Sequence, residues 1–185
     1  FEDKIPPQDV RDPAALARAE LALATLDRDP GPLFALVDAS RDDRVLELLR
    51  QSVEMYRSLY DGVEGETMAE AAPYIVGIPA GSRLRTHLLN EGWGRRWITV
   101  LRSQKPLLEV RRHLRKFLMA ELEGTEDPVY FRFHDPEVLR VYMQSCDTTE
   151  RKPWFDGVVD AFFVEDPDAD LSCLRIDPVV PGPRA

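Results

Sequence analysis

The chain has 185 residues, of which 44% are hydrophobic and 31% are charged, and its formal net charge at pH 7 is -9. This composition is ordinary for a soluble globular protein, and the length predicts one domain, with or without an appendage. The negative charge argues against non-specific binding to nucleic acid or to an anionic membrane surface, and no apolar run approaches the ~20 residues that span a bilayer.

The two cysteines, Cys146 and Cys173, are far apart in the sequence. Isolated cysteines of this kind are typical of buried free thiols in a reducing compartment rather than of a disulfide framework. No secretory signal is visible in a chain that begins at Phe1 without a Met. We therefore expect a cytoplasmic protein.

Apolar segments that suit strands alternate with amphipathic segments that suit helices over most of the chain. Residues 1–12 look irregular, and a helix is predicted from Pro13 to about Leu26. Strands are predicted where residues are nearly all apolar or alternate with period two, at 33–39, 74–78, 97–101, 130–134, 161–165 and 171–176.

The helices between these strands start at recognisable caps or turns. Ser40 with Asp43 resembles a capping box, and the helix that follows is predicted to bury Val45, Leu48, Leu49, Val53 and Tyr56. Further helices are predicted at residues 66–71, 84–89, 105–122 and 136–144. Residues 124–127 predict a turn, 153–157 predict a loop, and 178–185 predict a proline-rich tail or linker.

This alternation predicts an α/β fold, a single layered domain with a mixed β-sheet flanked by helices. The sheet is expected to be mixed because the last two strands follow each other directly, as in an antiparallel pair. We divide the chain into a lead-in and helix at residues 1–32, an α/β domain at 33–177 and the tail at 178–185.

The segment V-Y-F-R-F-H-D-P-E-V-L, residues 129–139, is the most informative in the chain. Asp135 is placed to cap a helix that begins at Pro136, a residue suited to the first helical position. Arg132 and Asp135 then lie near a strand-to-helix corner, where α/β proteins often place their sites. They fit either a catalytic pair, with His134 as a group that titrates near neutrality, or a salt-bridged structural corner.

Common catalytic and cofactor motifs are missing: there is no G-x-S-x-G, H-E-x-x-H, P-loop or C-x-x-C. The turn at Gly92-Trp93-Gly94 lacks the third glycine of a dinucleotide fingerprint. The histidines His87, His113 and His134 fall on three different predicted elements, without a close pair. The sequence therefore predicts no catalytic site, no cofactor and no metal.

Basic residues gather on the outer side of the predicted helix at 105–122. Arg111, Arg112, Arg115 and Lys116, with Lys105 before them, form a local positive patch in an acidic chain, and Arg112, Arg115 and Lys116 are the docking candidates. The patch fits either a solvated helix face whose charges pair with neighbours, or a surface that docks an acidic partner segment.

Six segments, in this order, resemble one known family: L-F-A-L-V-D-A, M-Y-R-S-L-Y-D-G, A-P-Y-I-V, G-W-G-R-R-W-I-T-V-L-R-S, L-L-E-V-R-R-H-L-R-K-F-L and V-Y-F-R-F-H-D-P-E-V-L. The family is that of the bacterial type VI secretion effector chaperones, also called adaptors, whose genes often lie between a VgrG spike gene and its toxin. The resemblance covers roughly residues 33–157, and F-R-F-H-D-P is its most distinctive part.

The resemblance implies a cytoplasmic, non-enzymatic protein that binds a cognate secreted effector and helps to load it onto the VgrG spike. The implied partners are that effector and the C-terminal region of VgrG, with no nucleic acid and no membrane. It carries over no catalytic residue, and the family usually has an aromatic residue where this chain has His134. Two other functions stay open from the residues alone: a small hydrolase using His134 and Asp135, and a structural subunit of a larger assembly.

Overall fold

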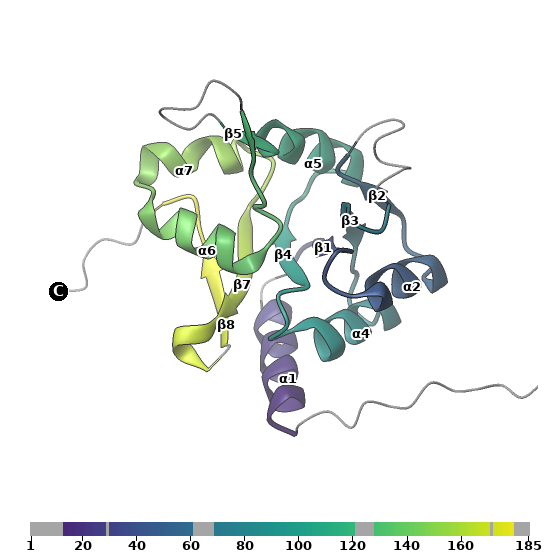
Figure 1. Cartoon of the computed structure of the whole chain (residues 1–185). Coiled ribbons are helices and arrows are strands. Elements are labelled where there is room, and N and C mark those ends of the chain that lie inside the picture. Colours follow the sequence, from purple (N-terminus) through teal and green to yellow (C-terminus); the bar gives the residue numbers. More distant parts are fainter. Residues whose placement is uncertain (1–12, 29, 61–68, 121–127, 171, 180–185) are drawn as a thin grey trace, which may run out of the picture.

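The computed structural model describes residues 13–28, 30–60, 69–120, 128–170 and 172–179, and Figure 1 shows their arrangement. At its centre lies a six-stranded sheet with the order β2-β3-β1-β4-β7-β8. Its strands are β1 (Leu33–Asp38), β2 (Tyr56–Ser58), β3 (Pro73–Gly77), β4 (Ile98–Arg102), β7 (Ala161–Asp166) and β8 (Ser172–Ile176).

The predicted α/β architecture, a single layered domain with helices around a sheet, is confirmed. Every described pairing within the sheet is antiparallel, however, including both neighbours of β1. Leu36 of β1 lies opposite Ile75 of β3 and Thr99 of β4. Strands that run in the same direction, such as β1 and β2 or β3 and β4, are separated in the sheet by a strand of the opposite direction, so the expected mixture of directions is absent from the described strands.

Helices cover both faces of this sheet. Because successive strand residues point to opposite faces, Ala35 and Val37 pack with α1 (Pro13–Asp27), α2 (Asp43–Gln51) and α4 (Arg83–Gly92). Phe34 and Leu36 pack on the other face. There they meet α5 (Leu107–Leu114), α6 (Pro136–Ser145) and α7 (Thr148–Phe155). The near-continuous apolar sequence of β1 thus reflects burial from two sides.

The helix after β1 differs from its predicted course at both ends. Its N-cap is Asp42, whose side chain accepts the N–H of Arg44, whereas Ser40 lies outside the helix and donates its hydroxyl to Asp38. Its C-cap is Ser52, where the backbone becomes extended. Val53 is therefore 98% exposed rather than buried, and Tyr56 belongs to strand β2.

The helix predicted at residues 105–122 is wrong for residues 115–120, and residues 121–122 lie outside the described part of the chain. A 3-10 turn at Arg115–Phe117 follows α5, and β5 (Met119–Ala120) pairs with β6 (Val129–Tyr130) in a separate two-stranded sheet. The ring of Phe117 stacks on Trp154 with centroids 4.0 Å apart. This contact with α7, which apolar spacing along one helix cannot reveal, fixes the chain where the helix ends.

The strand predicted at 130–134 is also wrong, because only Val129–Tyr130 is extended and it lies outside the central sheet. The amide of Phe133 bonds to the carbonyl of Phe131, and that of Asp135 to the carbonyl of Arg132, so the chain turns twice before α6. The predicted loop at 153–157 is mostly α7, which a capping box at Asp147 and Glu150 begins.

Several sequence predictions fall outside the described residues, wholly or in part. These are the irregular start at 1–12, the turn at 124–127, the first half of the helix at 66–71 and most of the tail at 178–185. The described second half of that predicted helix, residues 69–71, is a turn instead. The two cysteines are free thiols, with Cys146 buried and Cys173 half-buried. Among the described residues, no helix has the length and apolar character needed to cross a membrane.

Candidate functional site

The corner singled out in the sequence forms as a helix cap. The Asp135 carboxylate accepts the backbone N–H of Glu137 at 3.0 Å and that of Val138 at 3.5 Å, and Pro136 occupies the first turn of α6. The predicted cap is confirmed. Asp135 is nevertheless almost completely buried, so its charge requires more than two amide donors.

Two arginines supply the balancing charge for Asp135. Arg96, from the turn between α4 and β4, donates through Nε at 3.1 Å and through Nη2 at 2.7 Å, which is a bidentate fork. Arg41, just after β1, contacts the same carboxylate through Nη2. Arg96 also pairs with Glu137 of α6. The cap of α6 is thus tied to the segment that follows β1 and to the turn that precedes β4.

Arg132 has a different partner from the one its sequence position suggests. It does not pair with Asp135; its Nη2 donates to the Asp38 carboxylate at 2.6 Å. Asp38 ends strand β1, is fully buried, and also accepts the hydroxyl of Ser40 at 2.6 Å. Arg41 lies between the two carboxylates, with its Nε 3.5 Å from Asp38. We call Asp38, Asp135, Arg41, Arg96 and Arg132 the Asp38–Asp135 network.

The network holds both aspartates in their ionised form. Burial alone would raise the pKa of Asp38, but hydrogen bonds from His134, Ser40 and Arg132 bring that pKa well below its usual value. Burial likewise opposes ionisation of Asp135, and the Arg96 fork, with Arg41, lowers its pKa. These groups are saturated with opposite charge, which suits a structural role better than proton transfer near neutrality.

Glu165 of β7 behaves in the opposite way. Burial raises its pKa from 4.5 to about 7, although the backbone N–H groups of Gly94 and Arg96 donate to its carboxylate. The Arg96 amide lies 3.2 Å from Oε1 of Glu165. Arg96 itself has a left-handed backbone, with φ of 62°, which turns its side chain back toward Asp135. Glu165 therefore supports the turn that presents Arg96.

His134 lies inside this corner rather than at a surface. It is 2% exposed, with Nε2 3.5 Å from Asp38, while Nδ1 has no hydrogen-bond partner in the described part of the protein. Its carbonyl accepts the hydroxyl of Thr99. The histidines are not brought together: His113 bonds to the carbonyl of Trp154, and His87 faces Glu91. Across the described ranges, no three His, Cys, Asp or Glu residues are arranged to hold a metal ion.

The basic residues of α5 and of the 3-10 turn that follows it divide into two sets. Arg111 points inward and donates to the carbonyls of Ser58 and Tyr60, at 2.6 and 3.0 Å, so it anchors strand β2. Arg112 and Lys116 are exposed, and Arg115 is half-buried beside them. Leu108 and Met119 are exposed at the two ends of the same stretch. Docking by Arg112, Arg115 and Lys116 stays a prediction.

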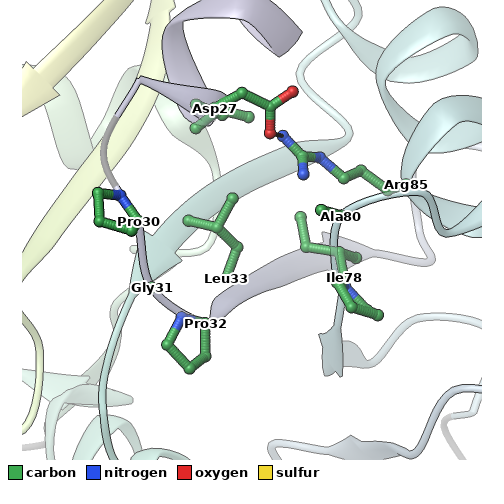
Figure 2. Close-up of a pocket in the computed structure, with 10 residues that line it drawn as sticks. Asp27, Pro30, Gly31, Pro32, Leu33, Ile78, Ala80 and Arg85 are labelled. Carbon is green, nitrogen blue, oxygen red and sulfur yellow. Dashed lines mark hydrogen bonds and ion pairs between the residues drawn. The ribbon is translucent and has the colours of Figure 1, made fainter.

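Sequence reasoning missed a cleft of about 390 Å³ at the end of α1, shown in Figure 2. Buried Leu26, Leu33 and Ile78 line it, and an ion pair between Arg85 of α4 and Asp27 of α1 closes one end. Arg85 and Asp27 lie 58 positions apart. No local pattern in the sequence links them, so only the packing of α1 on α4 could reveal the pair.

Residues 33–153 match the family described as a domain of unknown function, DUF4123. The chain belongs to this family. The DUF4123 match begins at the first residue of β1 and ends within α7, so it contains every residue of the Asp38–Asp135 network. No curated protein matches the chain, and no solved structure matches it either.

Proposed function

We propose that this DUF4123 chain is a non-enzymatic adaptor that binds a type VI secretion effector and assists its loading onto the VgrG spike. The ordered resemblance from L-F-A-L-V-D-A to F-R-F-H-D-P supports this proposal, and the family match covers the same region. An adaptor of this kind acts before secretion, so its place of action is the cytoplasm, and its partners are proteins rather than nucleic acid or membrane.

The observation that carries the proposal is the structural role of the polar side chains in the most distinctive segment. In F-R-F-H-D-P, Arg132 pairs with Asp38, Asp135 caps α6 and pairs with Arg96, and His134 is buried. Each polar side chain therefore fixes one element to another. A segment with this role maintains the shape of a binding scaffold, and it does so without presenting a reactive group to a substrate.

The geometry gives little support to the hydrolase alternative. A general base must lie within hydrogen-bond reach of a substrate proton, directly or through one water. His134 is enclosed, and the Asp135 carboxylate is already engaged by Arg96, Arg41 and two backbone amides. Neither side chain is available to a substrate in this arrangement.

The exposed basic stretch is the surface we propose for first contact with the partner. Arg112 and Lys116 are exposed on a chain of net charge -9. They therefore give an acidic partner segment a local positive surface to approach. Charges at such a surface mainly accelerate association and select the partner, rather than providing most of the affinity. Exposed Leu108 and Met119 offer apolar area beside them.

The test is co-expression of the chain with the toxin and the spike encoded beside it, followed by co-purification. We expect a stable complex with the toxin, with the VgrG C-terminal region, or with both. Deleting the gene should lower the level or the secretion of that toxin, while secretion through other spikes continues. Failure to bind either protein, together with normal secretion of the toxin from the deletion strain, would refute the adaptor function.

A further inference from the structure

The cleft at the end of α1 has a rigid, apolar construction. Its rim is formed by the exposed Pro30-Gly31-Pro32 linker on one side and by Ala80 on the other, as Figure 2 shows. Pro79, next to Ala80 in the chain, also lines the cleft. Gly31 has φ of +142°, and a Cβ there would lie 2.9 Å from Nε2 of Gln104. The linker is therefore held close against its neighbours, and the cleft exists before any ligand arrives.

The walls of the cleft offer almost no polar group to a ligand. Three of the lining residues are prolines, which have no N–H. The carbonyls of Leu26, Leu33, Pro32 and Pro79 already accept bonds from Arg102, Ile78, Ser103 and Ser82. The polar side chains of the cleft are thus those of the Arg85–Asp27 pair at one end.

Arg85 is an incompletely used donor. Its side chain is 4% exposed, its Nη2 donates to Asp27 at 2.7 Å, and its Nε has no hydrogen-bond partner in the described part of the protein. A guanidinium has five N–H donors and no acceptor, so it recognises carboxylates. Asp27, by contrast, is 58% exposed and is the last residue of α1, so it can leave the pair and be solvated.

These observations indicate the chemistry of an occupant. A guanidinium beside buried aliphatic side chains suits a group that has one carboxylate next to an aliphatic body. Asp27 shows that a side-chain carboxylate fits on Arg85. Its replacement by a carboxylate from another molecule exchanges one ion pair for another and leaves no buried charge unpaired.

We propose that this cleft binds a partner segment in which an aspartate or glutamate adjoins an aliphatic residue, and that the incoming carboxylate displaces Asp27 from Arg85. The inference rests on the proposed function, because the segment belongs to a protein that the adaptor carries. It adds a second contact region, separate from the basic stretch at Arg112, Arg115 and Lys116, with its own chemical requirement.

The full chain can be tested with two blocked peptides, acetyl-Leu-Asp-Leu-amide and its neutral twin acetyl-Leu-Asn-Leu-amide. Methyl signals of Leu33 and Ile78 report occupancy of the cleft by NMR titration. The Asp peptide is expected to shift them and to bind about tenfold more tightly than the Asn peptide, because an ionised acceptor makes the stronger bond to a guanidinium. Asp27→Asn should tighten binding of the Asp peptide several-fold, whereas Arg85→Gln should abolish it.

Arg83→Gln is the matched control, since Arg83 is exposed on the same helix and does not line the cleft. Equal binding of the two peptides, no binding of either, or no tightening in Asp27→Asn would overturn the proposal. The absence of tightening in Asp27→Asn would refute the proposal even if Arg85→Gln failed to fold. Co-purification of the effector unaffected by both Asp27→Asn and Arg85→Gln would reject this site while leaving the adaptor function intact.

Discussion

Replacing Asp135 by alanine tests whether the Asp38–Asp135 network or the helix cap alone holds this corner together. Loss of an N-cap aspartate costs about 1 kcal/mol of stability. The same change removes the charged acceptor of the Arg96 fork and of Arg41. Those arginine side chains are 41% and 30% exposed, so water solvates them in the variant and the further cost is reduced to about 1–2 kcal/mol.

The expected total for Asp135→Ala is therefore about 2–3 kcal/mol, measured by urea unfolding of the full chain with fluorescence from its buried tryptophans. Asp147→Ala is the matched control, because Asp147 caps α7 through an equivalent bond but is exposed, with no arginine pair among the ion pairs described for the protein. It should cost about 1 kcal/mol. Asp135→Asn keeps an acceptor for the cap and should fall between the two.

Equal losses of unfolding free energy for Asp135→Ala and Asp147→Ala would show that the arginines contribute nothing to stability. The structural role assigned to the network would then be wrong. A different outcome would refute the reasoning more deeply. If Asp135→Ala left the unfolding midpoint unchanged but removed a measurable turnover, the corner would be catalytic.

Three further outcomes are expected. Because burial raises the pKa of Glu165 from 4.5 to about 7, the folded state keeps this proton at pH values at which the unfolded state has lost it. The free energy of unfolding should therefore fall by roughly 3 kcal/mol as pH rises from 4.5 to about 7, and Glu165→Gln should remove this loss when unfolding is measured across that range. Asp38 has a lowered pKa, so stability should fall as pH drops below about 4, and Asp38→Asn, although less stable at pH 7, should flatten that acid limb. Reversing Arg112, Arg115 and Lys116 to Glu should slow association with the partner and flatten the salt dependence of the association rate. As a control, the same charge reversal at exposed Arg50, Arg57 and Arg83 should have a smaller effect. Equal association rates at low salt for the parent and for the variant at 112, 115 and 116 would contradict docking at that stretch.

The sequence predicts what depends on neighbouring residues. The apolar run of β1 and the amphipathic spacing of α4 specify their own structure, and Asp135-Pro136 is a local cap signal. The alternation at 130–134 predicts a strand wrongly, because a period of two reports which side chains are buried but not whether a neighbouring strand is present. Here the rings of Phe131 and Phe133 pack against Trp154 instead.

The pairing of charges was not predictable in the same way. Arg132 and Asp38 are 94 positions apart, and so are Arg41 and Asp135. Arg132 lies three residues from Asp135 in the chain, yet the fold exchanges these partners because β1 ends beside the turn that precedes α6. Local sequence identifies the charged residues of the site, whereas the sheet order decides which of them meet.

The position of β4 has a consequence for synthesis of the chain. Strands β2, β3, β1 and β4 are all encoded before residue 103, whereas β7, which covers the other edge of β4, begins at Ala161. As the chain leaves the ribosome, β4 therefore has an unpaired edge until Val100 and Leu101 meet Phe163 and Phe162. Exposed apolar edges of this kind promote intermolecular pairing. A chain truncated before Ala161 is expected to aggregate through β4, even though its first four strands can associate.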